Sequence, residues 1–230
     1  MTAGVRRDWL ALSSTGQTYG AAFDDSDDVA ETSWRGALTY KVTDAISAYA
    51  SYVQSVAPPQ IGVAPERGHQ YEAGVKVQPA GINALLSAAV FELEKNDITV
   101  SVVQEDGSIR QELVGKTRAR GVEVEGKAEL ANNLSLIGGY SYIDATVDRA
   151  VVRGTDVSGQ SFANVPHHTA SLWLNYAMPA RGAVGAQTFG VGARYIGAYD
   201  YALPNDSKAD AAVLVDAAYT YAFDDSTEVA

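Results

Sequence analysis

Residues 114–142 read VGKTRARGVEVEGKAELANNLSLIGGYSY, and this stretch decides the fold. Every second residue from Val122 to Leu130 is apolar or small, whereas the residues between them are charged. That alternation has the period of a β-strand with one apolar face and one wet face. Asn132-Asn133 suits a tight turn, after which an apolar face resumes and ends in Tyr140 and Tyr142. The stretch predicts a long hairpin whose apolar face lies either on a protein core or on lipid.

The composition limits the possible partners and sites. Seventeen Lys and Arg residues against 28 Asp and Glu residues give a net charge of −11 over 230 residues. Binding to nucleic acid needs a basic surface, so we expect no nucleic-acid partner. Cysteine is absent, which excludes a disulfide framework and a thiolate metal site. The length suits one large domain or two small ones, and no shift in composition marks a boundary.

The hydrophobic pattern excludes one kind of membrane span and leaves another open. No run of about 18 or more uncharged apolar residues occurs, which excludes a transmembrane helix. A membrane β-barrel stays open, because its signature is a series of alternating segments of about ten residues. The first residues lack the apolar core and cleavage site of a signal peptide, and alternate as the middle of a strand does. We therefore expect the chain to begin inside a structure that continues upstream.

The alternating pattern recurs about ten times along the chain. The expected strands span residues 2–14, 34–42, 45–54, 66–78, 83–102, 114–131, 134–142, 165–178, 188–199 and 213–221. Near residues 83–90 both faces of the strand are apolar, so its sides are less clearly defined.

The expected connections alternate in length. Four of them are short turns, at Thr43-Asp44, Pro79–Gly81, Asn132-Asn133 and Pro179–Gly182. Four others are long loops, at residues 14–31, 54–66, 145–163 and 199–211, and a turn at Glu105–Gly107 is the exception. Short turns at one end and long loops at the other are typical of outer-membrane barrels.

The aromatic residues give a second indication. Thirteen tyrosines and three tryptophans lie mostly near the ends of expected strands, on their apolar faces. Membrane barrels place aromatic rings at both interfaces, whereas an ordinary β-core can also be capped by aromatic residues. Because strands of ten or more residues exceed the usual five or six of globular sheets, the pattern favours the membrane.

Five segments carry a family resemblance. They are QYEAGVK (70–76), AAVF (88–91), KTRARGVEVE (116–125), NVPHHTASLW (164–173) and VDAAY (215–219). In this order and spacing they resemble the later barrel strands of TonB-dependent ferric-siderophore receptors, in the ferrichrome and ferrioxamine branch. The resemblance covers almost the whole chain.

The resemblance implies an all-β fold, an antiparallel up-and-down transmembrane β-barrel of 22 strands with a plugged lumen. About ten of those strands would come from this chain. No segment resembles the plug, the segment that contacts TonB, or a terminal strand ending in an aromatic residue. We therefore expect residues 1–230 to be a partial barrel domain, a fragment from which the plug domain and the last strands are absent.

The implied function is energy-dependent uptake of a ferric siderophore across the bacterial outer membrane. The implied partners are the siderophore, outer-membrane lipid and, through the missing N-terminal part, the TonB complex. Transport makes no covalent bond, so we expect neither an enzyme nor a resident cofactor. Aromatic side chains on the long loops are the candidate ligand contacts: Tyr19, Phe162 and Tyr201.

Several polar residues invite other interpretations. His167 and His168 are adjacent, and adjacent strand residues point to opposite faces, so we expect no shared metal ion. The acidic cluster Asp24–Asp28 has calcium-type ligands but fits a solvated external loop better. Glu123 and Glu125 share a face and more plausibly line a wet lumen than form a catalytic pair. Arg118 and Arg120 are in phase with Val122, so they belong beyond the lipid zone or across a bulge.

Two other functions stay open at this point. A passive porin-like channel would have the same wall but no plug. A soluble all-β binding or adhesion domain would fold in water without detergent. The cargo also stays open, since cobalamin or a sugar would suit the same class of transporter.

Overall fold

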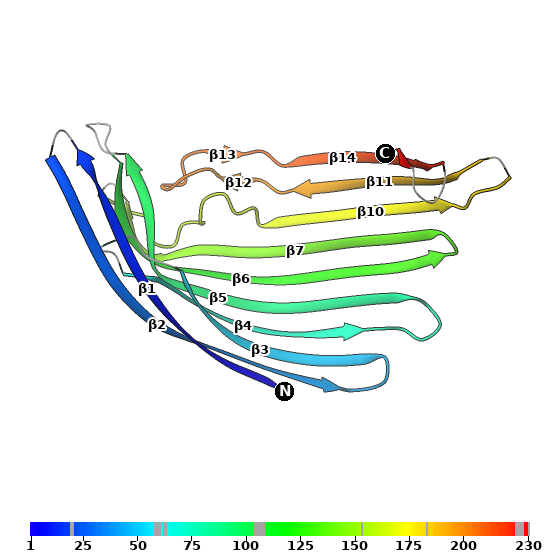
Figure 1. Cartoon of the computed structure of the whole chain (residues 1–230), viewed down its shortest axis with the longest axis horizontal. Helices are drawn as coiled ribbons and strands as arrows, with labels where there is room; N and C mark the ends of the chain where they lie inside the picture. The colour runs from blue at the N-terminus through cyan, green and yellow to red at the C-terminus, as the bar shows by residue number, and fades with distance from the viewer. Residues whose placement is uncertain are drawn as a thin grey trace.

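The structure is a computed structural model that describes residues 1–18, 21–57, 61, 64–103, 109–152, 154–182, 184–223 and 228–229, of which residues 18, 21, 97–103, 109–114 and 228–229 are described by backbone alone. Within these ranges, no helix is long and apolar enough to span a membrane. Eleven of the described strands form one antiparallel sheet, in which almost every strand pairs with its neighbour in sequence (Figure 1).

Ten long strands make up most of the sheet, which confirms the expected number. They are β1 (Thr2–Thr18), β2 (Ala21–Lys41), β3 (Ile46–Ala57), β4 (Glu66–Val77), β5 (Ala84–Val103), β6 (Ile109–Ala131), β7 (Leu134–Arg149), β10 (His168–Met178), β11 (Ala186–Ile196) and β14 (Ala212–Ala222). The short strand β15 (Glu228–Val229) pairs with β14. Two small hairpins interrupt the order, β8 (Val151–Val152) with β9 (Thr155–Asp156) and β12 (Tyr199–Asp200) with β13 (Lys208–Ala209). The sheet is open, with β1 and β15 at its two edges.

The registers sort the side chains onto two faces. Val122 pairs with Tyr142 and Val124 with Tyr140, so the apolar sets of β6 and β7 share one face, as the hairpin pattern predicted. Ala88 pairs with Val124, which resolves the ambiguous strand: the even-numbered residues of β5 lie on the apolar face. The same face continues across the sheet and carries most of its exposed large apolar side chains.

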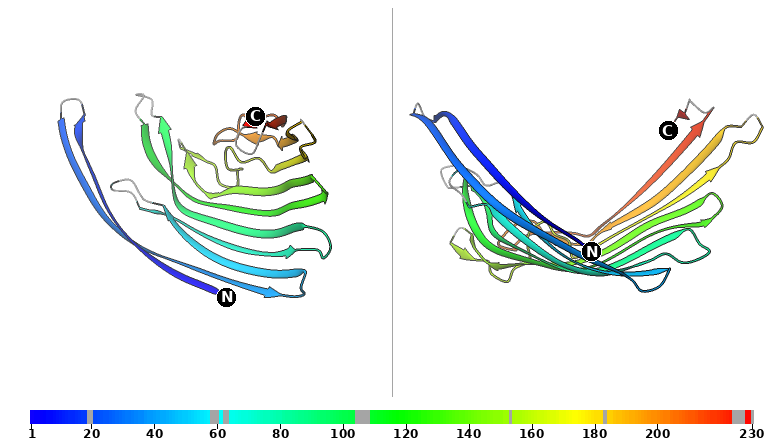
Figure 2. Two further views of the ribbon diagram at one scale, coloured as in Figure 1. Left: turned by 45° about the vertical axis from the view of Figure 1, so that its right-hand side comes forward. Right: turned by 60° about the horizontal axis from the view of Figure 1, so that its bottom comes forward.

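The sheet is curved into a trough, as two views show (Figure 2). Hollows in its surface are lined mainly by side chains of the polar face, including Arg6, Glu123, Lys127 and Arg194. Because a curved sheet is hollowed on its concave side, the polar face is concave and the apolar face is convex. This is the arrangement of a barrel wall with an apolar outside and a wet inside.

Aromatic side chains border the convex face in two rows. One row lies near the short turns and contains Tyr40, Tyr176, Phe189, Tyr219 and Tyr221; the other lies nearer the opposite end and contains Trp34, Tyr52, Tyr71, Tyr140, Tyr142 and Tyr195. On β11 the two rows are six residues apart, which is roughly 20 Å along a strand. That spacing is comparable with the apolar band of an outer-membrane barrel, about 25 Å tall.

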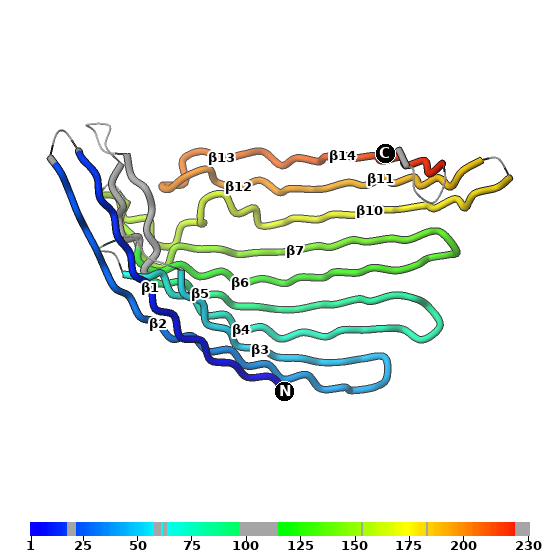
Figure 3. Tube along the Cα trace, in the orientation of Figure 1, coloured from blue at the N-terminus to red at the C-terminus, as the bar shows by residue number. Residues whose placement is uncertain are grey.

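The predicted short turns are confirmed, and they gather at one end of the sheet, here the turn end (Figure 3). The tight turn after β6 places Asn133 at φ 72°, a left-handed conformation that asparagine tolerates. The turn expected at residues 105–107 lies outside the described residues.

At the opposite end, here the loop end, one expected long loop is absent and two others are partly strand. Residues 14–31 are not a loop: β1 runs to Thr18 and β2 starts at Ala21, so the acidic cluster Asp24–Asp28 lies in a strand. β7 continues to Arg149, beyond the loop start expected at 145. Residues 199–211 contain the β12–β13 hairpin. The β1–β2 pairing continues through the acidic cluster because a two-stranded ribbon can be solvated on both faces, so polar side chains do not end the strands.

Candidate functional site

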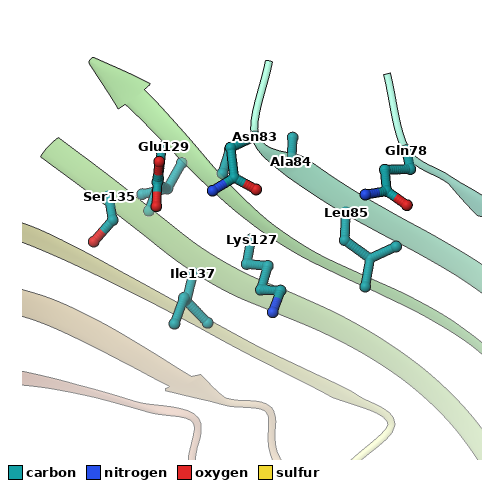
Figure 4. Close-up of a pocket in the computed structure, with 10 residues that line it drawn as sticks. Gln78, Asn83, Ala84, Leu85, Lys127, Glu129, Ser135 and Ile137 are labelled. Carbon is teal, nitrogen blue, oxygen red and sulfur yellow. The ribbon is translucent and has the colours of Figure 1, made fainter. Parts of the chain in front are cut away.

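The concave face carries polar side chains over a wide area, and its hollows are shallow. Near the turn end, a hollow of about 300 Å³ is lined by side chains of β5, β6 and β7 together with Gln78 and Asn83. The close-up shows the side chains of Lys127, Glu129 and Ile137 around it (Figure 4). The hollow is lined by the uncharged amides of Gln78 and Asn83 and by the opposite charges of Lys127 and Glu129. The hollow is therefore suited to polar contacts with a body inside the trough, more than to an apolar small molecule.

A group of carboxylates lies on the concave face at about mid-height. The Tyr49 hydroxyl donates to Glu72 Oε1 over 2.7 Å, and the Gln70 amide donates to Glu72 Oε2 over 2.9 Å. Glu123 and Glu125 lie two strands away on β6, roughly 10 Å across the sheet. This confirms that the two glutamates face the trough.

The concave wall carries both signs of charge here, because Lys127 and Arg194 line the same hollows as Glu125. Among the described residues, Glu123 and Glu125 form no salt bridge with a Lys or Arg of the sheet. The Lys76 ammonium lies 5.4 Å from the Tyr49 ring centroid. A wall with both signs of charge suits a body inside the trough that presents polar and charged groups of its own.

Three aromatic rings flatten the same face. Tyr49 lies over Gly74, Phe91 over Gly121, and Trp173 over both Gly190 and Gly192, at distances that leave no room for a Cβ atom. A ring laid across a strand glycine covers exposed backbone and keeps the wall smooth. Sequence reasoning missed Tyr49 and Trp173 as wall residues. One sequence signal could have revealed them: an aromatic residue among small polar residues on the polar face of a strand, as Tyr49 lies between Ser47 and Ser51.

The three candidate ligand contacts have different surroundings. Tyr19 lies outside the described residues. Phe162 is half-buried and packs against a small apolar cluster at the loop end. Tyr201 is 53% exposed, and its ring meets that of Tyr199 at 5.7 Å. Of the candidates that are described, Tyr201 is the one that presents an accessible aromatic ring.

The two adjacent histidines do not lie as predicted, on opposite faces of one strand. His167 precedes β10 and is not a strand residue, and both imidazoles lie close to the Tyr142 ring. Each has its own hydrogen bond: His167 Nδ1 is 2.9 Å from the Ile143 carbonyl oxygen, and His168 Nδ1 is 2.8 Å from the Tyr140 hydroxyl. Among the described residues, no group of three or more His, Cys, Asp or Glu side chains is placed to hold a metal ion.

The arginines of β6 lie beyond the aromatic row of the convex face, as predicted. Arg120 bonds to Glu92, and Arg118 bonds to Glu94 at 2.9 Å and to Asp148 at 3.3 Å. Lys116 also reaches Glu94, at 2.7 Å. This ionic cluster links β5, β6 and β7 where the strands rise above the apolar band.

The cluster predicts a pH dependence of stability. The hydrogen bond from Lys116, with a further one from Arg118, holds the pKa of Glu94 below its ordinary value. A folded pKa below the unfolded value of about 4.3 stabilises the fold above that pH, and this contribution is lost as the pH falls towards the folded pKa. We expect Glu94→Gln to lower the free energy of unfolding of the full-length protein by about 1 kcal/mol at pH 7, with no difference from wild type in acid.

Urea unfolding in detergent micelles between pH 7 and pH 3 measures this difference. Glu129→Gln is the matched control, because Glu129 is an exposed glutamate on the same sheet. A difference between wild type and Glu94→Gln that stays constant down to pH 3 would contradict the assignment.

The fold and these two faces define a segment of the wall of an outer-membrane β-barrel. Residues 1–229 match the family model described as TonB dependent receptor-like, beta-barrel, and the chain belongs to this family of outer-membrane transport receptors.

The sequence relatives include a named transporter and a named receptor. The chain is 35% identical over 230 residues to the ferrichrome outer membrane transporter/phage receptor of Escherichia coli K12, covering 96% of this chain and 29% of that protein. It is 32% identical over 196 residues to the ferrioxamine receptor of Yersinia enterocolitica, covering 80% of this chain and 26% of that protein. The chain thus spans less than a third of the length of these relatives.

A solved structure confirms the fold. The siderophore receptor PiuA from Acinetobacter baumannii superimposes with a TM-score of 0.79 at 22% identity, covering 98% of this chain and 35% of that one. The expected architecture, a partial outer-membrane barrel with an open edge on each side, is therefore confirmed.

Proposed function

We propose that this chain is part of the wall of an outer-membrane receptor that takes up a ferric siderophore. The observation that carries the proposal is the 35% identity to a ferrichrome transporter along nearly the whole chain. The convex apolar face would contact lipid, and the turn end would face the periplasm. Capture of the iron chelate and its passage make no covalent bond, so we propose no catalytic residue and no resident cofactor.

The concave wall suits a receptor whose lumen is filled. Carboxylates at mid-height, flattened aromatic surfaces and a polar hollow at the turn end would pack against a plug domain with polar and charged side chains. We propose that energy coupling to the TonB complex acts through parts of the full-length protein outside these residues. At the loop end, Tyr201 is the proposed cargo contact, with Tyr19 and Phe162 as further candidates.

Uptake of radioactive iron tests the proposal. The full-length protein is produced in a Gram-negative strain that lacks its own siderophore receptors, and is supplied with ferrichrome or ferrioxamine B. We expect saturable uptake of at least one chelate, lost when TonB is deleted. Tyr201→Ala should raise the half-saturating concentration about tenfold, equivalent to about 1.4 kcal/mol, because an exposed ring would be removed from the capture surface.

The control and the contradicting outcomes are distinct. Tyr40→Ala removes a ring from the turn-end row of the convex face and should leave the half-saturating concentration unchanged. Uptake that is not saturable and continues without TonB would indicate a passive channel. No uptake of either chelate, with the protein present in the outer membrane, would reject both as cargo.

A further inference from the structure

The buried apolar side chains of this open sheet are concentrated at one place at its loop end, called here the rim. Apart from Pro65, every apolar side chain that is buried among the described residues belongs to the end of β7 or to the two loops beside it. The loops are the β7–β10 connection (150–167) and the β11–β14 connection (197–211). Together with the end of β7 they are called here the two-loop body.

The first loop folds back onto β7. Val147 and Val157 are both fully shielded from solvent, and Ala150 and Val152 pack with them. The Val157 amide donates to the Ala150 carbonyl over 3.0 Å, and the Gly159 amide donates to the Val147 carbonyl over 2.7 Å. Buried apolar contacts and closed backbone bonds make a segment resistant to local opening. The first loop is therefore an extension of the wall.

The second loop completes the apolar cluster of the first. Leu203 packs against the cluster formed by the first loop, although the two segments are far apart in sequence. The second loop has its own hairpin, in which Tyr199 pairs with Ala209. Removing Leu203 would expose apolar surface of the first loop as well as its own, so the stability of each loop depends on the other.

Asn205 fastens the two loops by hydrogen bonds. Its backbone amide donates to Gln160 Oε1 over 2.8 Å, and its side-chain amide donates to the Ser161 carbonyl over 3.0 Å. A third link joins the Asn164 amide to the Asp200 carbonyl over 2.8 Å. These bonds hold the loops in one register, next to the exposed ring of Tyr201.

We propose that the two-loop body is a single rigid unit of the rim, latched by Leu203 and Asn205, so that its loops open together and do not close separately over a ligand. Resting on the proposed function, this makes the two-loop body a fixed platform that presents Tyr201 to the cargo. A cargo that contacts either loop would then stabilise both loops.

Hydrogen exchange tests the unit without any cargo. Peptides covering 145–163 and 197–209 are followed in the full-length protein in lipid nanodiscs. In wild type, the slowest amides of both segments should have the same protection factor, which is the intrinsic exchange rate divided by the observed one, as expected of one cooperative unit. Leu203→Ala and Asn205→Ala should each speed exchange in both segments, by about tenfold, whereas Asp206→Ala, an exposed residue of the same loop, should change neither.

The outcomes separate this proposal from the transport proposal. Faster exchange in the second loop alone, different wild-type protection factors in the two segments, or no effect of either substitution would each overturn the rigid unit. Asn205→Ala keeps the test valid where Leu203→Ala does not assemble. Because no siderophore is present, failure here leaves the uptake result standing, and failure of uptake leaves this result standing.

Discussion

Val124→Arg is expected to lower the free energy of unfolding of the full-length protein by about 2–4 kcal/mol, the cost of a guanidinium near the middle of the bilayer. Val124 lies on the convex face, 45% exposed, within the apolar band that runs from Val122 to Leu130 on β6. Its neighbours across the ladder are Ala88 and Tyr140, neither of which is charged. The arginine would therefore find only lipid and apolar side chains. Urea unfolding in lipid vesicles measures the loss.

The matched control places the same side chain on the other face at the same height. Ser87 pairs with Glu125 on the concave face, directly beside the pair formed by Ala88 and Val124. Ser87→Arg would lie on a polar surface between the Glu125 carboxylate on β6 and Lys76 on β4, so we expect a change of about 0.5 kcal/mol or less. Equal losses at Val124 and Ser87 would overturn the sidedness of the sheet.

The hairpin could be predicted from the sequence because its information is local. Alternation between Val122 and Leu130 fixes which residues share a face, and Asn132-Asn133 marks where the chain turns. The two-residue turn alone would pair Gly126 with Gly139, but a register shift between Glu129 and Ala131 pairs it with Gly138, which puts both apolar sets on one face. A family resemblance then selected lipid over a protein core for the apolar face, which periodicity alone did not do.

The loop end could not be predicted in the same way. In β1 and β2 the alternation of apolar and polar residues fades where both faces meet water, so Asp24–Asp28 resembled a loop. The two-loop body has no local pattern at all, because Asn205 and Gln160 are 45 residues apart. Contacts of that separation depend on how the strands between them pack, and a single sequence does not reveal them.

Gly121→Val is expected to lower the free energy of unfolding by about 1–3 kcal/mol, the usual cost of overpacking. A Cβ atom at Gly121 would lie 2.5 Å from the Phe91 ring and 2.6 Å from the Tyr142 carbonyl oxygen. The ring can turn aside, but the carbonyl belongs to the β6–β7 ladder and moves only with the strand. We therefore expect Phe91→Ala in the same chain to recover part of the loss and not all of it.

Gly36→Val is the control that separates crowding from the loss of a glycine. Gly36 is also a strand glycine, but a Cβ atom there would meet nothing within 4 Å. It lies on the convex face, where valine suits both the strand and lipid, so we expect no loss of stability. Urea unfolding of the variants in detergent micelles measures these differences. An equal cost at Gly36 and Gly121, or full recovery with Phe91→Ala, would show that the close approach of β6 to β7 is not what requires glycine at position 121.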